Sequence, residues 1–148
     1  MQTRNFLCLM MLALLLPLTA AHAGAQATLA VNIPFDFTVC REQLPAGKYK
    51  VRPISSASAN VLLVRSEDNR AAEIACTNSI QSTKPVANGK LTFNRYGDQY
   101  FLSEMWFPGE RVGNQLVKSE REEAVLRELT PPKKRERVTI KITEVKPN

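Results

Sequence analysis

Few residues in this chain could do chemistry, and histidine is nearly absent. The only histidine, His22, stands at the end of an apolar N-terminal segment that has the form of a signal peptide. If it leaves with that segment, the mature chain has no imidazole to act as a base or a metal ligand. A Ser-His-Asp or Cys-His nucleophilic site and a histidine-ligated zinc or copper centre are then excluded.

The carboxylates do not form a recognisable catalytic pair. Four acids that could serve in proton transfer fall in different segments of the chain: Asp36, Asp68, Asp98 and Glu104. No GxxxxGK[ST] loop and no GxGxxG motif marks a nucleotide phosphate site. The sequence therefore predicts a protein that is not an enzyme and that carries no metal or other cofactor. A small carboxylate-dependent enzyme of unknown chemistry is the alternative.

The first 23 residues are expected to direct export. Arg4 is followed by an apolar run at 6–18, and Ala21-His22-Ala23 forms a small-x-small cleavage site. Thirteen helical residues rise only about 20 Å, against roughly 30 Å of bilayer hydrocarbon, so an uncleaved anchor is the weaker alternative. We expect a mature protein of residues 24–148, without a membrane span, in the periplasm or outside the cell.

The exported chain would keep two cysteines, Cys40 and Cys76. Oxidising compartments usually convert such pairs into disulfides. We expect a Cys40–Cys76 bridge, worth roughly 4 kcal/mol of stability on the chain-entropy estimate. Two unpaired thiols are the alternative, because neither cysteine belongs to a CxxC motif.

Strands must position most of these residues. Apolar and polar residues alternate almost everywhere between 27 and 107, as is typical of half-buried strands, and polar, Pro and Gly stretches at 56–60, 67–70 and 82–89 separate them. The length allows one domain, over residues 24–132. We expect an all-β fold, an antiparallel β-sandwich or small barrel of about seven strands.

The clearest local pattern is a hairpin between residues 90 and 107. Gly97-Asp98 fits a two-residue type II′ turn. The resulting register pairs Phe93 with Leu102 and Arg95 with Tyr100. One face of the hairpin would then carry four further apolar residues: Tyr96, Phe101, Met105 and Phe107. Either these are buried under the C-terminal segment, or they form an exposed strip that binds a ligand or protein partner.

A short helix is expected near 120–129. Ser119 and Glu122 have the spacing of a capping box, in which the serine hydroxyl meets the Glu122 amide and the glutamate side chain reaches back. The helix would present an apolar stripe and one i,i+4 ion pair, formed respectively by Val125, Leu126 and Leu129 and by Glu123 with Arg127. Residues 133–148 would be a basic tail or a final strand.

The segment Leu44 to Tyr49 resembles the tyrosine corner of Greek-key β-proteins. In that motif a glycine, here Gly47, precedes the tyrosine by two positions, and the tyrosine hydroxyl bonds to backbone a few residues upstream. The resemblance implies that Tyr49 is buried. It implies nothing about a substrate.

Three motifs together resemble a group of small exported bacterial β-proteins of unknown function. These motifs are IPFDFTV at 33–39, LPAGKYKV at 44–51 and RYGDQYFL at 95–102, and the similarity spans about residues 30 to 106. That group usually has glycine where this chain has Cys40, so the expected disulfide would be particular to this chain. The resemblance implies export and a β fold and carries no activity. The LPAGxYxV portion is also similar to the β-sandwich modules of surface adhesins and transthyretin-like domains.

Basic residues indicate a second surface. After loss of the signal peptide the chain keeps 19 Lys and Arg against 14 Asp and Glu. Lys48, Lys50 and Arg52 alternate along one strand, and a basic run follows at 133–137; both would attract anionic envelope polymers or lipid head groups. A solvated face and tail is the alternative.

The sequence thus predicts a non-catalytic structural or interaction module of the cell envelope. Its partner would be an envelope protein or polysaccharide and not nucleic acid, since no recognition motif for nucleic acid is present. An anionic polymer held on the basic strand face is one alternative, and the carboxylate enzyme is the other.

Overall fold

The structure is a computed structural model that describes residues 27–55, 57–129, 135–142 and 144–146. The predicted signal peptide at 1–23 and its cleavage site lie outside the described residues, as do Lys133 and Lys134 of the basic run. Among the described residues, no helix is long and apolar enough to cross a membrane.

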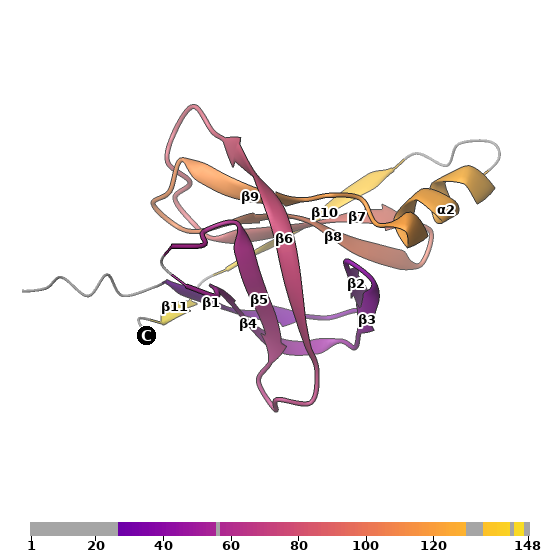
Figure 1. Ribbon diagram of the computed structural model, residues 1–148, viewed down its shortest axis with the longest axis horizontal. Coiled ribbons are helices and arrows are strands. Elements are labelled where there is room, and N and C mark those ends of the chain that lie inside the picture. The colour runs from indigo at the N-terminus through magenta and orange to yellow at the C-terminus, as the bar shows by residue number, and fades with distance from the viewer. Residues whose placement is uncertain (1–26, 56, 130–134, 143, 147–148) are drawn as a thin grey trace, which may run out of the picture.

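Eleven strands and one helix make up the described part of the chain (Figure 1). In chain order the elements are β1 (Thr28–Ile33), β2 (Phe37–Val39), β3 (Glu42–Leu44), β4 (Gly47–Pro53), β5 (Val61–Ser66), β6 (Ala72–Gln81), β7 (Lys90–Tyr96), β8 (Gln99–Trp106), β9 (Val112–Leu116), α2 (Glu120–Glu128), β10 (Glu136–Lys141) and β11 (Glu144–Lys146). The fold is therefore mostly β with one short helix, as predicted. There are more strands than the predicted seven, because the segment before β4 is divided at Pro34 and at Cys40-Arg41 and because β9 and β11 were not expected.

The strands follow the order β10-β7-β8-β9-β6-β5-β4-β1-β11; off this path, β2 pairs with β8 and β3 pairs with β2. Strand β6 joins the two halves: its first half, Ala72–Cys76, pairs with β5, and its second half, Thr77–Gln81, pairs with β9. Figure 1 shows β6 as the long strand that crosses the front of the molecule. The consecutive strands β10 and β11 stand at opposite ends of the order, so the C-terminal segment also contributes to both halves.

The core contains residues from strands of both halves. Strands β1, β4 and β5 bury every second residue, as their alternating sequences predict. The largest fully buried side chains are Tyr49, Phe37, Phe93 and Phe101. Phe37 contacts both Tyr49 and Phe93 edge-on, at centroid distances of 5.1 and 5.6 Å, so the aromatic rings tie strands of both halves together.

Strands β7 and β8 form the predicted hairpin. Gly97 has a φ of 62°, the positive value that the first central position of a type II′ turn requires. Phe93 lies opposite Leu102 and Arg95 opposite Tyr100, so the predicted register is confirmed near the turn. Further along, the register shifts: Thr92 lies opposite Glu104, which leaves Ser103 as an extra residue in β8.

This bulge corrects one predicted face. Met105 lies opposite Leu91 and is fully buried with it, on the face of Phe93. It does not share a face with Phe101 and Tyr96, because one inserted residue reverses the side of every residue after it.

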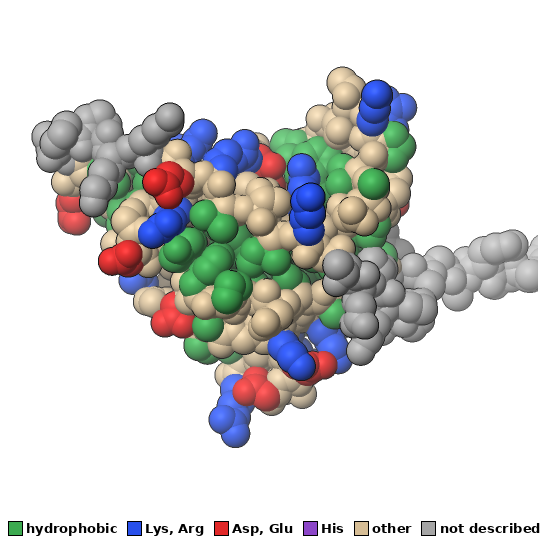
Figure 2. All heavy atoms as spheres, turned by 180° about the vertical axis from the view of Figure 1, so that it is seen from behind, with side chains coloured by type: hydrophobic (Ala, Val, Ile, Leu, Met, Phe, Trp, Pro, Cys, Tyr) green, Lys and Arg blue, Asp and Glu red, His purple; other side chains and the backbone are tan. Residues whose placement is uncertain are grey.

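Helix α2 begins as its capping box predicts. The Glu122 amide donates to the Ser119 hydroxyl oxygen at 3.2 Å, and Arg127 lies 3.5 Å from Glu123 in the predicted i,i+4 pair. Beyond the helix, β10 pairs with β7 and β11 with β1, so described residues of the 133–148 segment form strands. From behind, acidic and basic side chains are interspersed around a group of hydrophobic ones (Figure 2).

Candidate functional site

The predicted basic residues of β4 all lie on its outer face. Tyr49 and Val51 point into the core. The basic residues alternate with them: Lys48 and Lys50 are exposed, and Arg52 is half-buried. Strand β5 adds a fourth cation, because its register places Arg65 directly opposite Lys50. We call the set formed by Lys48, Lys50, Arg52 and Arg65 the basic row.

None of the four cations in the basic row forms an ion pair within the described part of the chain. Glu67 follows directly on β5 and its amide donates to the Lys48 carbonyl at 2.8 Å, yet its carboxylate makes no ion pair with Lys48. Other arginines do have acidic partners: Arg70 with Asp68, Arg95 with Glu136, Arg127 with Glu123 and Arg137 with Glu104. The basic row is therefore a group of like charges that no ion pair among the described residues neutralises.

The second basic segment does not extend this row. Arg135 is exposed, and Arg137 on β10 pairs with Glu104 of β8. Strand β10 stands at one end of the strand order, next to β7, and β4 lies near the other end. The two basic stretches that the sequence singled out therefore belong to different halves of the fold.

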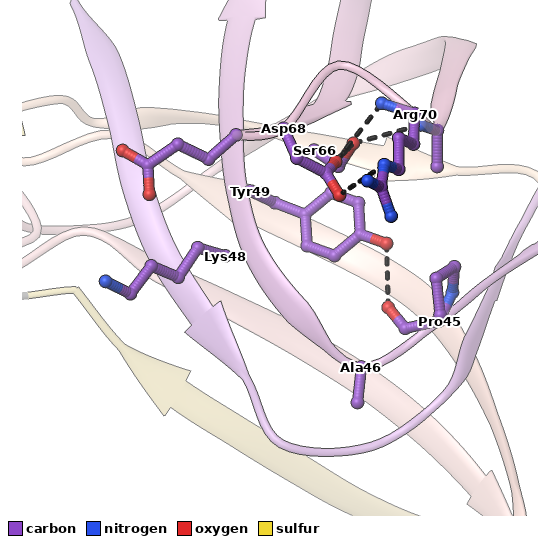
Figure 3. Close-up of a pocket in the computed structure, with 9 residues that line it drawn as sticks. Pro45, Ala46, Lys48, Tyr49, Ser66, Asp68 and Arg70 are labelled. Atoms are coloured by element: carbon purple, nitrogen blue, oxygen red, sulfur yellow. Dashed lines mark hydrogen bonds and ion pairs between the residues drawn. The ribbon is translucent and has the colours of Figure 1, made fainter.

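A pocket of about 530 Å³ lies beside Tyr49, at the end of the basic row where the β5–β6 turn approaches the β3–β4 turn (Figure 3). The Tyr49 side chain is 1% exposed, and its hydroxyl donates to the Pro45 carbonyl at 2.7 Å. Asp36 supports the same turn by accepting the Ala46 amide at 2.8 Å. Burial raises the pKa of Tyr49, and the carboxylates of Asp68 and Asp36 raise it further.

Of the two acids that line this pocket, Glu67 and Asp68, the second is engaged in a turn. Asp68 accepts the Ser66 hydroxyl at 2.6 Å and the Arg70 amide at 3.1 Å. These bonds, the Ser66 bond foremost, lower the pKa of Asp68, so it stays ionised at neutral pH. An ionised carboxylate held by its own turn serves the shape of the β5–β6 connection and offers no proton to a substrate.

Two of the other acids considered for catalysis have partners of their own, and the third is a turn residue. Asp36 holds the Ala46 amide, and Glu104 lies in β8 beside Arg137 and Trp106. Asp98 is exposed in the hairpin turn. The structure brings no two of Asp36, Asp68, Asp98 and Glu104 together by a hydrogen bond. Among the described residues, no cluster of His, Cys, Asp and Glu could hold a metal ion.

The predicted disulfide is absent from the structure: Cys40 and Cys76 are both free. Cys76 is exposed between buried Ala75 and Thr77, so its side chain lies on the outer face of β6. Cys40 instead packs against the core, and its thiol lies beside the Cys76 backbone and Glu73. The two side chains thus approach β6 from opposite faces, and no bridge joins them.

Cys40 also stands in an unusual backbone conformation. Its φ is 52°, in the left-handed region that glycine adopts without strain. Burial raises the pKa of the Cys40 thiol, and the Glu73 carboxylate adds to that effect. Cys40 is therefore a poorly reactive thiol.

The predicted partner surface is buried. The exposed fractions are 3% for Tyr96, 2% for Phe101, 0% for Met105 and 8% for Phe107. The exposed strip is therefore wrong for this structure, and the alternative of a hairpin covered on both faces describes it. Strong alternation cannot distinguish a solvent-facing apolar strip from one that a later segment covers.

Helix α2 covers part of that strip through an acid. Glu122 is 4% exposed, and one carboxylate oxygen accepts both the Asn94 side-chain amide at 2.8 Å and the Tyr96 hydroxyl at 2.9 Å. The glutamate side chain therefore points to β7. The capping box had predicted that it reaches back to its own N-cap, and that part of the prediction is wrong. Burial together with the Glu122 carboxylate raises the pKa of Tyr96 to about 12. The predicted apolar stripe of the helix is only half-buried.

A second pocket, of about 290 Å³, lies at the opposite end of β4, where Pro53, Asn60, Phe107 and Asn114 are among its lining residues. Its polar groups already bond to one another: the Asn114 side-chain amide donates to the Ala59 carbonyl at 2.9 Å and to the Thr77 hydroxyl at 3.0 Å. The Ser79 hydroxyl likewise donates to the Asn60 side chain at 2.8 Å, so most of the polar side chains that line this pocket are engaged with one another.

The site that remains is the basic row. The sequence predicted the three members of the basic row on β4 but not Arg65. The only sign of Arg65 in the sequence is its place at the end of the apolar run 61–64. Comparison with known proteins gives no further guide, because no protein-family model, no curated protein and no solved structure matches the chain.

Proposed function

We propose that this protein is an exported, non-catalytic interaction module of the cell envelope that holds anionic envelope groups on its basic row. The observation that carries the proposal is the cross-strand pair of Lys50 and Arg65. Like charges directly opposite one another on a sheet are destabilising, by up to about 1 kcal/mol. An anionic ligand would remove this repulsion.

The neighbours of the pair strengthen the argument. Lys48 and Arg52 flank Lys50 on the same face of β4, so four cations share one surface, and none of them forms an ion pair among the described residues. Their fields add in the solvent above the strands and attract anions, an effect that salt weakens over about 10 Å at 0.1 M. The excess of Lys and Arg over Asp and Glu in the whole chain acts in the same direction.

The fold that we propose for this module is a β-sandwich with a Greek-key tyrosine corner at Tyr49. The shared strand β6, the burial of alternate residues and the hydroxyl bond from Tyr49 to Pro45 support it. A sandwich presents one flat outer face per sheet. The basic row would occupy such a face on β4 and β5.

The test is retention of the protein on immobilised dextran sulfate, a soluble-polymer anion without lipid, over a salt gradient. We expect K50E/R65E to elute at clearly lower salt than the wild type. The control K84E/K118E changes net charge equally at two exposed lysines outside the basic row and should elute close to the wild type. Equal shifts for both double variants would show that only net charge matters and would refute the proposal.

A further inference from the structure

The outer face that carries the basic row continues into exposed aliphatic side chains. Ile54 follows β4 and its amide donates to the Val61 carbonyl at 2.9 Å, which extends the β4–β5 pairing by one residue. Ile54 is 41% exposed and Ile74 on β6 is 54% exposed. These are two of only four large hydrophobic residues that are exposed in the described part of the chain.

The strand register places these residues in one patch. Leu63 of β5 lies between Arg52 of β4 and Ile74 of β6, and Val61 lies opposite Cys76 in the next row. Val61 and Leu63 are half-buried, so they reach the surface between the two isoleucines. We call the set formed by Ile54, Val61, Leu63 and Ile74 the aliphatic row. It adjoins the basic row through the Arg52–Leu63 pair.

We propose that the two rows together form a docking surface for an anionic lipid bilayer. This inference rests on the proposed function and names its partner. A soluble polyanion needs only cations, and exposed isoleucines would add nothing to its binding. An anionic bilayer surface offers negative head groups to the basic row and an apolar boundary just below them to the aliphatic row.

The geometry fits a surface that lies on a membrane. Strands β4, β5 and β6 are adjacent in the sheet, so the basic and aliphatic side chains project from the same side of neighbouring strands. Arg52 and Leu63 form the boundary between the rows, and long arginine and lysine side chains can reach head groups while their aliphatic stems rest on the apolar layer. The protein would lie on the bilayer and would not span it.

The experiment measures sedimentation with vesicles, using protein purified after export and with its N-terminus established by mass spectrometry. Vesicles of phosphatidylglycerol with phosphatidylethanolamine are compared with pure phosphatidylcholine. We expect binding to the anionic vesicles, and a loss of about tenfold in affinity for I54S/I74S, since both side chains would leave water on binding. The K50E/R65E variant should lose at least as much, because each charge near an anionic surface contributes substantially.

Two controls separate this inference from the proposed function. I54S/I74S should keep its retention on dextran sulfate, whereas K50E/R65E should lose both activities. V117S removes the most exposed large hydrophobic residue among the described residues, at 67% exposure, outside the patch. This variant should bind vesicles as the wild type does. Circular dichroism confirms that each variant is folded.

The outcomes are distinct. Retention on dextran sulfate without vesicle binding would overturn the lipid inference and leave the proposed function standing. Vesicle binding that I54S/I74S does not weaken, or that V117S weakens equally, would also overturn the inference. Failure to bind either dextran sulfate or anionic vesicles would overturn both.

Discussion

The hydrogen bond from Tyr49 to Pro45 allows the most direct test of how this fold is held together. The Tyr49 ring is 1% exposed, and its hydroxyl donates to the Pro45 carbonyl at 2.7 Å. Tyr49→Phe keeps the ring and its edge contact with Phe37 and removes only the hydroxyl. Because Pro45 is exposed, water can take over its carbonyl, so the cost should be near the ordinary net value of one bond, about 1 kcal/mol.

For a domain of this size a loss of about 1 kcal/mol lowers the melting temperature by about 3–6 °C. Thermal unfolding followed by circular dichroism would measure it, with urea unfolding as a second readout. Tyr100→Phe is the matched control, because Tyr100 is half-buried and its hydroxyl makes no hydrogen bond among the described residues. Equal stability of the wild type and Tyr49→Phe, or equal losses in both variants, would refute the reasoning that this bond fixes the β3–β4 turn.

Three further predictions concern single groups. The folded state holds the Tyr96 proton up to a pKa of about 12, whereas the unfolded state releases it near the usual value of about 10. The contribution of Tyr96 to stability should therefore be constant below pH 10 and be lost between pH 10 and 12. Urea unfolding across that range should show a smaller fall in stability for Tyr96→Phe than for the wild type. Glu122→Ala leaves the buried donors of Asn94 and Tyr96 without their acceptor and should cost about 2–4 kcal/mol in urea unfolding, whereas Glu123→Ala, which breaks only an exposed ion pair, should cost under about 0.5 kcal/mol. In the native protein a thiol reagent should modify exposed Cys76 quickly and Cys40 slowly, because burial raises the pKa of Cys40; a protein without free thiols would contradict the structure.

Local signals predicted the local structure well. The capping serine placed the start of α2 correctly, and Gly97-Asp98 gave both the turn and the pairing of Phe93 with Leu102. Each of these features depends on a few residues close in sequence, whose own backbone geometry decides the outcome. The alternation along β4 likewise predicted which side of that strand is basic.

The alternation of apolar and polar residues could not predict where a bulge reverses the faces of a strand or which side chains a distant segment covers. A bulge at Ser103 moved Met105 to the other face of its hairpin. The Glu122 carboxylate accepts hydrogen bonds from two donors on β7 and none from its own N-cap, because a buried carboxylate is more stable with two donors than with one. Cys40 and Cys76 came close in space, but on opposite faces of β6, which spacing along the chain does not reveal.

The same limit explains why the candidate site is visible only after folding. Along β4 the sequence shows three cations, which an ordinary solvated strand face also has. The pairing with β5 and β6 adds Arg65 beside Lys50 and places Leu63 and Ile74 next to Arg52. Opposing cations and isoleucines that are exposed to water do not stabilise a solvated face. Both features cost free energy in the isolated protein. Because this surface combines both costs, we propose for it a partner that carries negative charge above an apolar layer.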